Sequence, residues 1–244
     1  VASLMNSLQT YFPFSPPIGH AELPKELVND LNKGCDDIVN DKELSKSEDF
    51  SHQLVGQVKQ ELKIPKDIIN KWSKWFGTQV RIYAAGYFNQ TYIPEQNIQT
   101  TPKEQILQEI NLMKIDVISA WYVRSFAGDY NPIHTHPNSD LTCVGFLKVP
   151  DLSKERKNLA QSSGESFGDF HSNKIGDGSQ NSVLEVLSNN GPNGSFYEND
   201  NIGFFPKVGN WYLFPANLRH LAYPFESDGE RRSFSINMNT HIAK

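Results

Sequence analysis

The chain contains few cysteines, no long hydrophobic run and no excess of one charge, and each absence excludes a class of protein. Two cysteines, Cys35 and Cys143, occur among 244 residues, too few for the disulfide framework of small secreted domains. No segment approaches the ~20 consecutive apolar residues that a transmembrane helix requires. Residues 1–6 also lack the basic and apolar pattern of a signal peptide, so we expect a cytoplasmic protein with no membrane partner.

The charge of the chain is nearly balanced, with 23 basic and 28 acidic side chains and a formal net charge of −5. A protein that attracts nucleic acid through its overall charge carries a basic excess, so nucleic acid is not indicated as a partner. Hydrophobic residues make up 38% and aromatic residues 11% of the chain, which is sufficient for a sizeable core. We therefore expect one domain over residues 1–244.

Apolar residues recur at helical spacing in three segments of the first half of the chain. These segments are residues 23–39, 64–76 and 101–113. In the third, Thr101 is expected to cap a helix, with Pro102 at the first helical position and Glu104 completing a capping box. In the second, the helical spacing of Trp72 and Trp75 favours core packing over a ligand-binding stripe.

Short runs rich in β-branched and aromatic residues predict strands. These runs are residues 80–87, 117–126, 142–149, 211–214 and 233–238. Helices that come first, with most strands later, favour a mainly β core with a helical buttress over alternating βαβ units. In this interpretation residues 1–115 are mostly helical support and residues 116–244 form the β core.

A polar stretch over residues 151–201 interrupts the predicted β core. It is rich in Ser, Gly, Asn and Asp and contains few apolar residues outside residues 183–187. A stretch that long inside a compact domain is usually a functional lid or a disordered excursion. We take residues 162–181 and the aromatic-rich residues 196–205 as candidate lids over an active site.

Two of the seven histidines, His134 and His136, lie two residues apart just before a predicted strand. In extended backbone, residues i and i+2 point to the same side, so these imidazoles can bind one metal ion together. The spacing alone is a weak signal, and a third ligand must come from elsewhere in the chain. His220, which follows the run from Trp211 to Arg219, is the candidate. The remaining histidines lack a partner pattern and are expected to be exposed to solvent: His20, His52, His171 and His241.

A second pattern follows His220, in which Arg231 and Ser233 begin a series of polar residues at strand spacing. On one face of a strand, a guanidinium group can bind a carboxylate through two hydrogen bonds, and a hydroxyl group can add a third. Arg232 would then point to the opposite face and to solvent. Without the histidines, Arg231 would be interpreted as an ordinary surface charge.

Together these motifs resemble those of the 2-oxoglutarate/Fe(II)-dependent oxygenases. The order is His-x-His, an apolar strand, Gly-x-Trp-Tyr-Leu-Phe-Pro, a histidine and Arg-x-Ser. It is most similar to a branch common in phages and marine bacteria, and more distantly to the prolyl hydroxylases. Residues 121–150 and 204–238 carry the resemblance, while residues 11–18 and the helices after them are similar less specifically. The resemblance implies a double-stranded β-helix (a jelly-roll or cupin-like core) and, for a phage protein, action in the host cytoplasm.

The resemblance also implies roles for particular residues. The family's His-x-Asp pair corresponds to His134 and His136, its distal histidine to His220, and its Arg-x-Ser motif to Arg231 and Ser233. The usual carboxylate ligand is therefore replaced by His136. Asp140, four residues later, is an alternative ligand if the loop between them folds back, and a preference for a metal other than iron is a third alternative.

By resemblance, the activity is that of a dioxygenase of the hydroxylase type. Fe(II) is the metal, 2-oxoglutarate and O2 are the co-substrates, and Arg231 and Ser233 bind the far carboxylate of 2-oxoglutarate. Tyr122, on the strand before the histidine pair, is a candidate for the co-substrate pocket, although its strand is as readily explained by core packing. The sequence does not identify the primary substrate.

Two alternatives remain at this point. A cupin-like metal protein that does not use 2-oxoglutarate would also carry His-x-His on a double-stranded β-helix, but it would not need Arg231 and Ser233. A non-catalytic interaction module could retain the fold without the metal. Metal binding and 2-oxoglutarate binding separate these alternatives.

Overall fold

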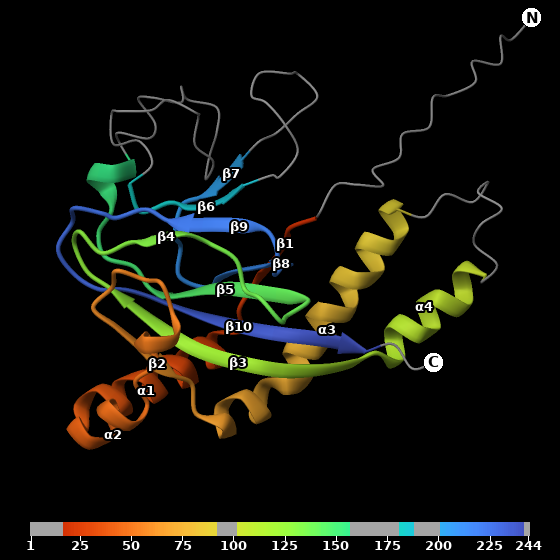
Figure 1. Ribbon diagram of the computed structural model, residues 1–244, viewed down its shortest axis with the longest axis horizontal. Helices are drawn as coiled ribbons and strands as arrows, with labels where there is room; N and C mark the ends of the chain where they lie inside the picture. The colour runs from red at the N-terminus through yellow and green to blue at the C-terminus, as the bar shows by residue number, and fades with distance from the viewer. Residues whose placement is uncertain (1–16, 92–101, 157–180, 188–200, 242–244) are drawn as a thin grey trace, which may run out of the picture.

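Two antiparallel β-sheets lie one above the other in the computed structural model (Figure 1), which describes residues 17–91, 102–156, 181–187 and 201–241. The larger sheet has six strands, which are, in spatial order, β1 (Gly19–Glu22), β8 (Asn210–Pro215), β5 (Leu141–Lys148), β10 (Arg231–His241), β3 (Lys114–Ser125) and β2 (Gln60–Lys63). The smaller sheet has four, which are β4 (Asn131–His134), β9 (Arg219–Ala222), β6 (Leu184–Leu187) and β7 (Asn201–Phe204). The mainly β core expected from the sequence is confirmed.

Helices cover the face of the larger sheet that is turned away from the smaller sheet (Figure 1). The helices on this face are α1 (Lys25–Asn40), α3 (Lys66–Thr91) and α4 (Lys103–Leu112). The short helix α2 (Lys42–Ser47) and the 3-10 turn η1 (Ser51–Gln53) connect α1 to β2. The buried side of α1 carries Leu27, Leu31 and Ile38, which join one hydrophobic cluster with the sheet. Among the described residues, no helix is long and apolar enough to cross a membrane.

The expected strand over residues 80–87 is wrong, because these residues continue helix α3 to Thr91. Val80 is fully buried and falls four residues after Phe76, which is also buried, so the apolar stripe keeps the helical period. Tyr83 extends the same side of the helix and donates a hydrogen bond to the carbonyl of Pro17 at 2.9 Å. Packing on the sheet therefore outweighs the β propensity of this aromatic-rich run.

Two other expectations about the helical part have clear outcomes. Trp72 and Trp75 pack against the main hydrophobic cluster, which confirms their role in the core. Thr101 lies outside the described residues, and α4 begins after Pro102 without a side-chain cap.

Most of the candidate lids lies outside the described residues. Of the first, residues 162–181, only Asn181 is described, and of the second, residues 196–205, only residues 201–205 are described.

Strand β10 carries two different rows of side chains, one on each face. One row faces the smaller sheet and consists of Arg231, Ser233, Ser235 and Asn237. The other row includes Phe234, Ile236 and Met238, which are fully buried under the helices. The two-residue period of a strand thus separates a polar interior face from an apolar helix-covered face.

Arg232 differs from the expectation that it faces solvent. It belongs to the helix-covered row, and only 1% of it is exposed. Its guanidinium group pairs with Glu230 and with Asp36 of α1, and it donates to the backbone carbonyl of Asn32. Because the helices cover this face of β10, the residue links the sheet to α1 and is not a surface charge.

Candidate active site

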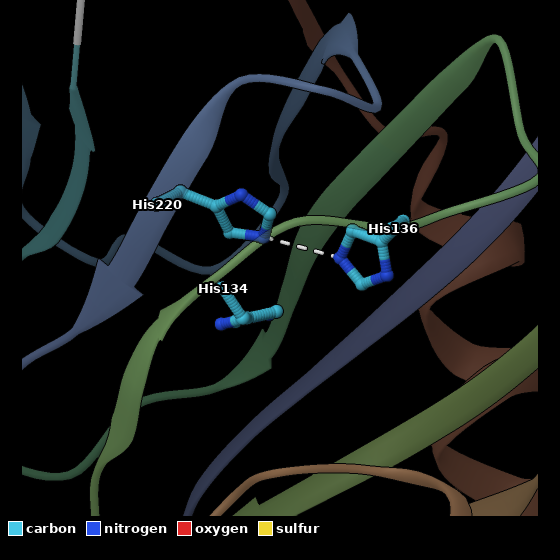
Figure 2. Close-up of side chains that lie close together, drawn as sticks. All are labelled: His134, His136 and His220. Carbon is cyan, nitrogen blue, oxygen red and sulfur yellow. Dashed lines mark hydrogen bonds between the residues drawn. The ribbon is translucent and has the colours of Figure 1, made fainter.

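Three imidazoles converge between the two sheets (Figure 2). His134 lies at the end of β4 directly opposite His220 on β9, and His136 follows two residues later. Directly opposed residues of neighbouring strands bring their side chains close together, and the ring centroids of His134 and His220 are 4.3 Å apart. One nitrogen of each ring lies within 4.8 Å of the other two. This is a suitable spacing for three ligands of a single ion.

The hydrogen bonds of these rings fit a metal site. Nδ1 of His134 lies 2.7 Å from the carbonyl oxygen of Pro132, and Nδ1 of His220 lies 2.9 Å from that of Leu218. A carbonyl oxygen only accepts, so each Nδ1 carries the proton and each Nε2 presents a lone pair. Nε2 of His136 lies only 3.1 Å from Nε2 of His220. A cation between these nitrogens would accept both lone pairs.

Burial keeps the three imidazoles neutral, which is the state that binds metal. It lowers the pKa of His220 to about 3 and that of His136 to about 4, with a further contribution from His134 in both cases. The pKa of His134 is lowered by burial as well, although its bond to Pro132 opposes the shift. No proton therefore has to leave these rings when a metal binds near pH 7.

Asn237 of β10 is the outer partner of His136, with its amide nitrogen 3.4 Å from Nδ1 of the ring. Its Oδ1 accepts a hydrogen bond from Thr142 at 2.9 Å. When His136 binds a metal through Nε2, its Nδ1 must carry a proton and needs an acceptor. Turning the Asn237 amide by half a turn supplies that acceptor and lets the amide nitrogen donate to Thr142.

We therefore expect Asn237→Leu, a change of similar size, to weaken metal binding by about 10- to 100-fold, as is typical for loss of an outer partner of a metal-binding histidine. Asn237→Asp keeps the acceptor and should retain most of the affinity. Titration of the metal-free protein with Fe(II) or Mn(II) under anaerobic conditions measures the effect. Equal affinity in the wild type and Asn237→Leu would remove Asn237 from the site.

Asp140, the alternative ligand, lies elsewhere. Its side chain is exposed, and its Oδ2 accepts hydrogen bonds from the backbone amide and the hydroxyl of Thr240, at 2.7 and 3.0 Å. It is not among the described residues whose ligand atoms cluster with the histidines. The loop does not turn Asp140 toward the histidines, because its carboxylate connects the start of β5 to the end of β10.

A cavity of about 380 Å³ extends from the three histidines between the sheets. Its wall includes all four members of the polar row on β10, Arg231 to Asn237. Apart from the histidines, Arg231 and Glu61 are the two side chains of a charged type among the described residues that line it. The cavity thus contains a metal-ligand cluster, one cationic group and one acidic group.

The guanidinium group of Arg231 is buried and only partly satisfied. Its Nη1 donates to the backbone carbonyls of Ser182 and Tyr223, at 2.9 and 3.1 Å, and the group lies over the ring of Phe225. Within the described part of the chain it forms no salt bridge, and Nε and Nη2 make no hydrogen bond. Burial lowers its pKa to about 10, so it remains charged at neutral pH. A buried cation with two free donors can bind a carboxylate.

Tyr122 lies on the other face of β3 from the cavity. It is fully buried among the helices, close enough to α1 that a Cβ added to Gly34 would lie 2.9 Å from its hydroxyl oxygen. On the cavity face of β3 lie Trp121, Val123 and Ser125. The sequence predicted this strand correctly. Side chains alternate between its two faces, however, and Trp121, not Tyr122, is on the cavity face, with its ring centroid 5.5 Å from that of His136.

The other described histidines lie outside this site and are exposed, as expected: His20, His52 and His241. His171 lies outside the described residues. Two cavity residues were missed from the sequence, Glu61 on the edge strand β2 and Asn131 at the start of β4. Neither stands in a motif, so the only available signal for Glu61 was an acidic residue beside the apolar pair Leu62 and Ile64.

Residues 119–237 match a family model whose description is "Putative 2OG-Fe(II) oxygenase". The matched range begins in β3 and contains the three histidines, Arg231 and Ser233. No curated protein sequence matches the chain.

Solved structures of 2-oxoglutarate oxygenases are similar in fold. The carbocyclase SnoK from nogalamycin biosynthesis, described as a non-heme alpha-ketoglutarate-dependent enzyme, is 9% identical, with 91% of this chain and 78% of that chain covered and a TM-score of 0.51. A prolyl-4-hydroxylase from Pseudomonas putida is 11% identical over 91% of each chain, with a TM-score of 0.49. A 2OG-Fe(II) oxygenase family oxidoreductase from Burkholderia pseudomallei is 12% identical, with a TM-score of 0.38; the match covers 78% of this chain but only 66% of that protein. The two facing sheets form the double-stranded β-helix of this class.

Proposed function

Residues 119–237 of this chain belong to the 2OG-Fe(II) oxygenase family, and from that premise we propose that the protein is an Fe(II)- and 2-oxoglutarate-dependent dioxygenase that hydroxylates a substrate. One observation carries the proposal. Three neutral imidazoles meet in the same cavity as a buried guanidinium group that has no carboxylate partner among the described residues. A cupin-like metal protein has no need of the guanidinium group, and a non-catalytic module has no need of either feature.

His134, His136 and His220 would hold the iron, each through Nε2. The carbonyls of Pro132 and Leu218 fix the orientation of two of the rings, and Asn237 orients the third. When bound, iron(II) with 2-oxoglutarate supplies O2 activation, with oxidative decarboxylation of the co-substrate to succinate and carbon dioxide. The residues of the chain hold the reactants in position and limit access of water.

Arg231 and Ser233 would bind the carboxylate of 2-oxoglutarate that lies away from the metal. The carbonyls of Ser182 and Tyr223 hold Nη1, which leaves Nε and Nη2 free to donate to a ligand. These two donors match the two oxygens of a carboxylate, and the hydroxyl of Ser233 lies on the same face of β10. Because the group is already fixed before binding, little conformational entropy is lost when the anion arrives.

Three imidazoles give the metal site one more positive charge than two imidazoles and a carboxylate would. This charge alters both the affinity and the redox potential of the ion. We keep iron as the metal because of the family, and treat His136 as the third ligand because Asp140 is bound to Thr240. Manganese or zinc is the alternative if iron does not bind.

Anaerobic absorption spectroscopy tests the proposal directly. Fe(II) added to the metal-free protein and titrated with 2-oxoglutarate should give a visible metal-to-ligand charge-transfer band, because the co-substrate chelates the ion. Succinate formation from 2-oxoglutarate in the presence of O2 should follow.

Two other results would each favour an alternative. Metal binding without the band, and without succinate across many candidate substrates, would favour the cupin-like protein. A dialysed sample that holds no iron, manganese or zinc, and whose melting temperature does not rise when metal is added, would favour the non-catalytic module.

A further inference from the structure

A second charged group lies in the cavity, and the proposed chemistry does not use it. Glu61, on the edge strand β2, is only 2% exposed and lines the cavity. Among the described residues its carboxyl group has no hydrogen bond and no salt bridge, and its Oε2 is buried without a partner. Burial raises the pKa of Glu61 to about 7, with a smaller contribution from the carboxylate of Asp49. An unpaired buried acid is costly unless a ligand supplies the missing partner.

A second acceptor lies close to Glu61. Oδ1 of Asn131 is also buried without a hydrogen-bond partner. The two oxygens approach Gly56 together, since a Cβ added there would collide with Oδ1 of Asn131 and lie 2.9 Å from Oε1 of Glu61. Gly56 therefore leaves room for two acceptors that face no donor of the described chain. A group rich in N–H donors would satisfy both.

The surrounding wall of this part of the cavity is apolar and aromatic. Phe50, Trp121 and Val123 form one buried cluster, and all three line the cavity beside Glu61. The rings of Phe50 and Trp121 lie 5.7 Å apart. Aromatic faces attract cations, and apolar walls suit an aliphatic chain.

Glu61 and Arg231 do not neutralise each other, although they line one cavity. Glu61 pairs across the sheet with Val123, and Val123 pairs with Ser233, so two strand spacings separate Glu61 from Ser233. No salt bridge joins Glu61 to Arg231 in the described part of the chain. Two separate unpaired charges of opposite sign indicate two ligands of opposite charge.

We propose that Glu61 and Asn131 bind a cationic nitrogen group, an ammonium or a guanidinium, at the end of an aliphatic chain of the primary substrate. The inference rests on the proposed function, in which Arg231 takes the anionic co-substrate. Asn131 lies on the same strand as His134, three residues away, or about 10 Å along extended backbone. A substrate held at Glu61 would thus present a carbon several bonds from its cationic end to the metal centre.

Binding to the full chain loaded with Mn(II) and 2-oxoglutarate, with O2 excluded, tests the proposal without turnover. The small probes are pentylamine and butylguanidine, with 1-pentanol as the uncharged match. The peptide probes are acetyl-Gly-Lys-Gly-amide and its norleucine counterpart.

We expect the cations to bind about 10- to 100-fold more tightly than the neutral matches, as for hydrogen bonds to a charged group. Calorimetry in two buffers should show release of up to about half a proton at pH 7, because the cation lowers the pKa of Glu61.

Glu61→Gln should abolish both the cation preference and the proton release. Glu104→Gln, which makes the same change at an exposed position of α4, should change neither. If Glu61→Gln does not fold, the proton release measured with the wild type still tests whether the cation binds at Glu61. Equal affinity for cation and neutral match, or a preference that survives Glu61→Gln, would overturn the inference.

The probes separate the two sources of such a group. Tighter binding of the lysine peptide than of pentylamine points to a polypeptide side chain, and the reverse to a small amine.

Different results would contradict the proposed substrate class and the proposed oxygenase function. If 2-oxoglutarate binds in an Arg231-dependent way but cations show no preference, only the substrate class is wrong. If cations bind through Glu61 while 2-oxoglutarate does not bind, the oxygenase function is wrong.

Discussion

Arg231→Ala is expected to weaken 2-oxoglutarate binding by about 2 to 5 kcal/mol, more than about 30-fold, while metal affinity stays nearly unchanged. The reason is that Arg231 is the only arginine or lysine among the described residues that line the cavity. Its removal leaves the far carboxylate of the co-substrate buried without a cation. Titration of the Fe(II)-loaded protein with 2-oxoglutarate, followed by the charge-transfer band, measures the loss.

Two further variants make the Arg231 result specific. Arg231→Lys keeps the charge but cannot form two parallel hydrogen bonds, so an intermediate loss is expected. Arg219→Ala removes an arginine from an exposed position of β9, outside the cavity, and should leave 2-oxoglutarate affinity as in the wild type. Because alanine at 231 also releases the carbonyls of Ser182 and Tyr223, folding of each variant is checked by circular dichroism. An Arg231→Ala protein that folds and binds 2-oxoglutarate normally would exclude Arg231 from the site.

Removal of one imidazole should have the largest effect on the metal. Loss of a residue that hydrogen-bonds a metal ligand weakens metal binding by up to about 100-fold. Because His220→Ala removes a ligand itself, we expect its affinity for Fe(II) or Mn(II) to fall by more than that. Wild-type protein should gain about 2.7 kcal/mol of unfolding free energy when metal is present at 100 times its Kd. The variant should gain almost none at the same concentration. Thermal unfolding with and without metal measures both.

Asp140→Ala is the matched control for the metal experiment. Because the carboxylate of Asp140 binds Thr240, we expect its loss to leave metal affinity unchanged, while folding stability decreases slightly. His136→Asp, which restores the carboxylate usual in the family, should keep the metal bound. Loss of metal binding in Asp140→Ala would instead make Asp140 the third ligand in place of His136.

The pH dependence of metal binding follows from the same site. Burial places the pKa values of His136 and His220 at about 4 and about 3, below the ordinary value of about 6.5. Both rings are therefore neutral from pH 6 to 8, and we expect metal affinity to be flat over that range. The metal-free fold should lose stability as pH falls below about 6.5, because the unfolded chain then binds protons that the folded chain does not.

Local patterns in the sequence were sufficient for four of the six strands of the larger sheet. The predicted runs at residues 117–126, 142–149, 211–214 and 233–238 correspond to β3, β5, β8 and β10. Their alternation also separated Arg231 and Ser233 from the buried apolar row of β10. The same reasoning failed at residues 80–87, where a helix carries aromatic and β-branched residues because its stripe packs on the sheet.

Strands β4, β6 and β7 of the smaller sheet were not predicted, whereas a strand was expected to begin at His220, where β9 lies. Strands β4, β6, β7 and β9 have four residues each, too few to show a period. Glu61 was missed for a related reason. An acidic residue at the edge of a sheet is ordinarily exposed, but Glu61 is only 2% exposed, and Gly56 and Asn131 lie close to its carboxyl group.

By itself, the sequence determined which residue types are available for chemistry: a His-x-His pair, a distal histidine and an Arg-x-Ser motif, in an order that resembles one family. Only the tertiary structure decided which of them meet, because side-chain contacts across sheets depend on register and on the phase of each strand. Register placed His134 opposite His220. Phase turned Trp121 to the cavity and Tyr122 away from it, and it buried Arg232 under α1. The pairing of two sheets left Arg231 and Glu61 as separate, unpartnered charges in one cavity.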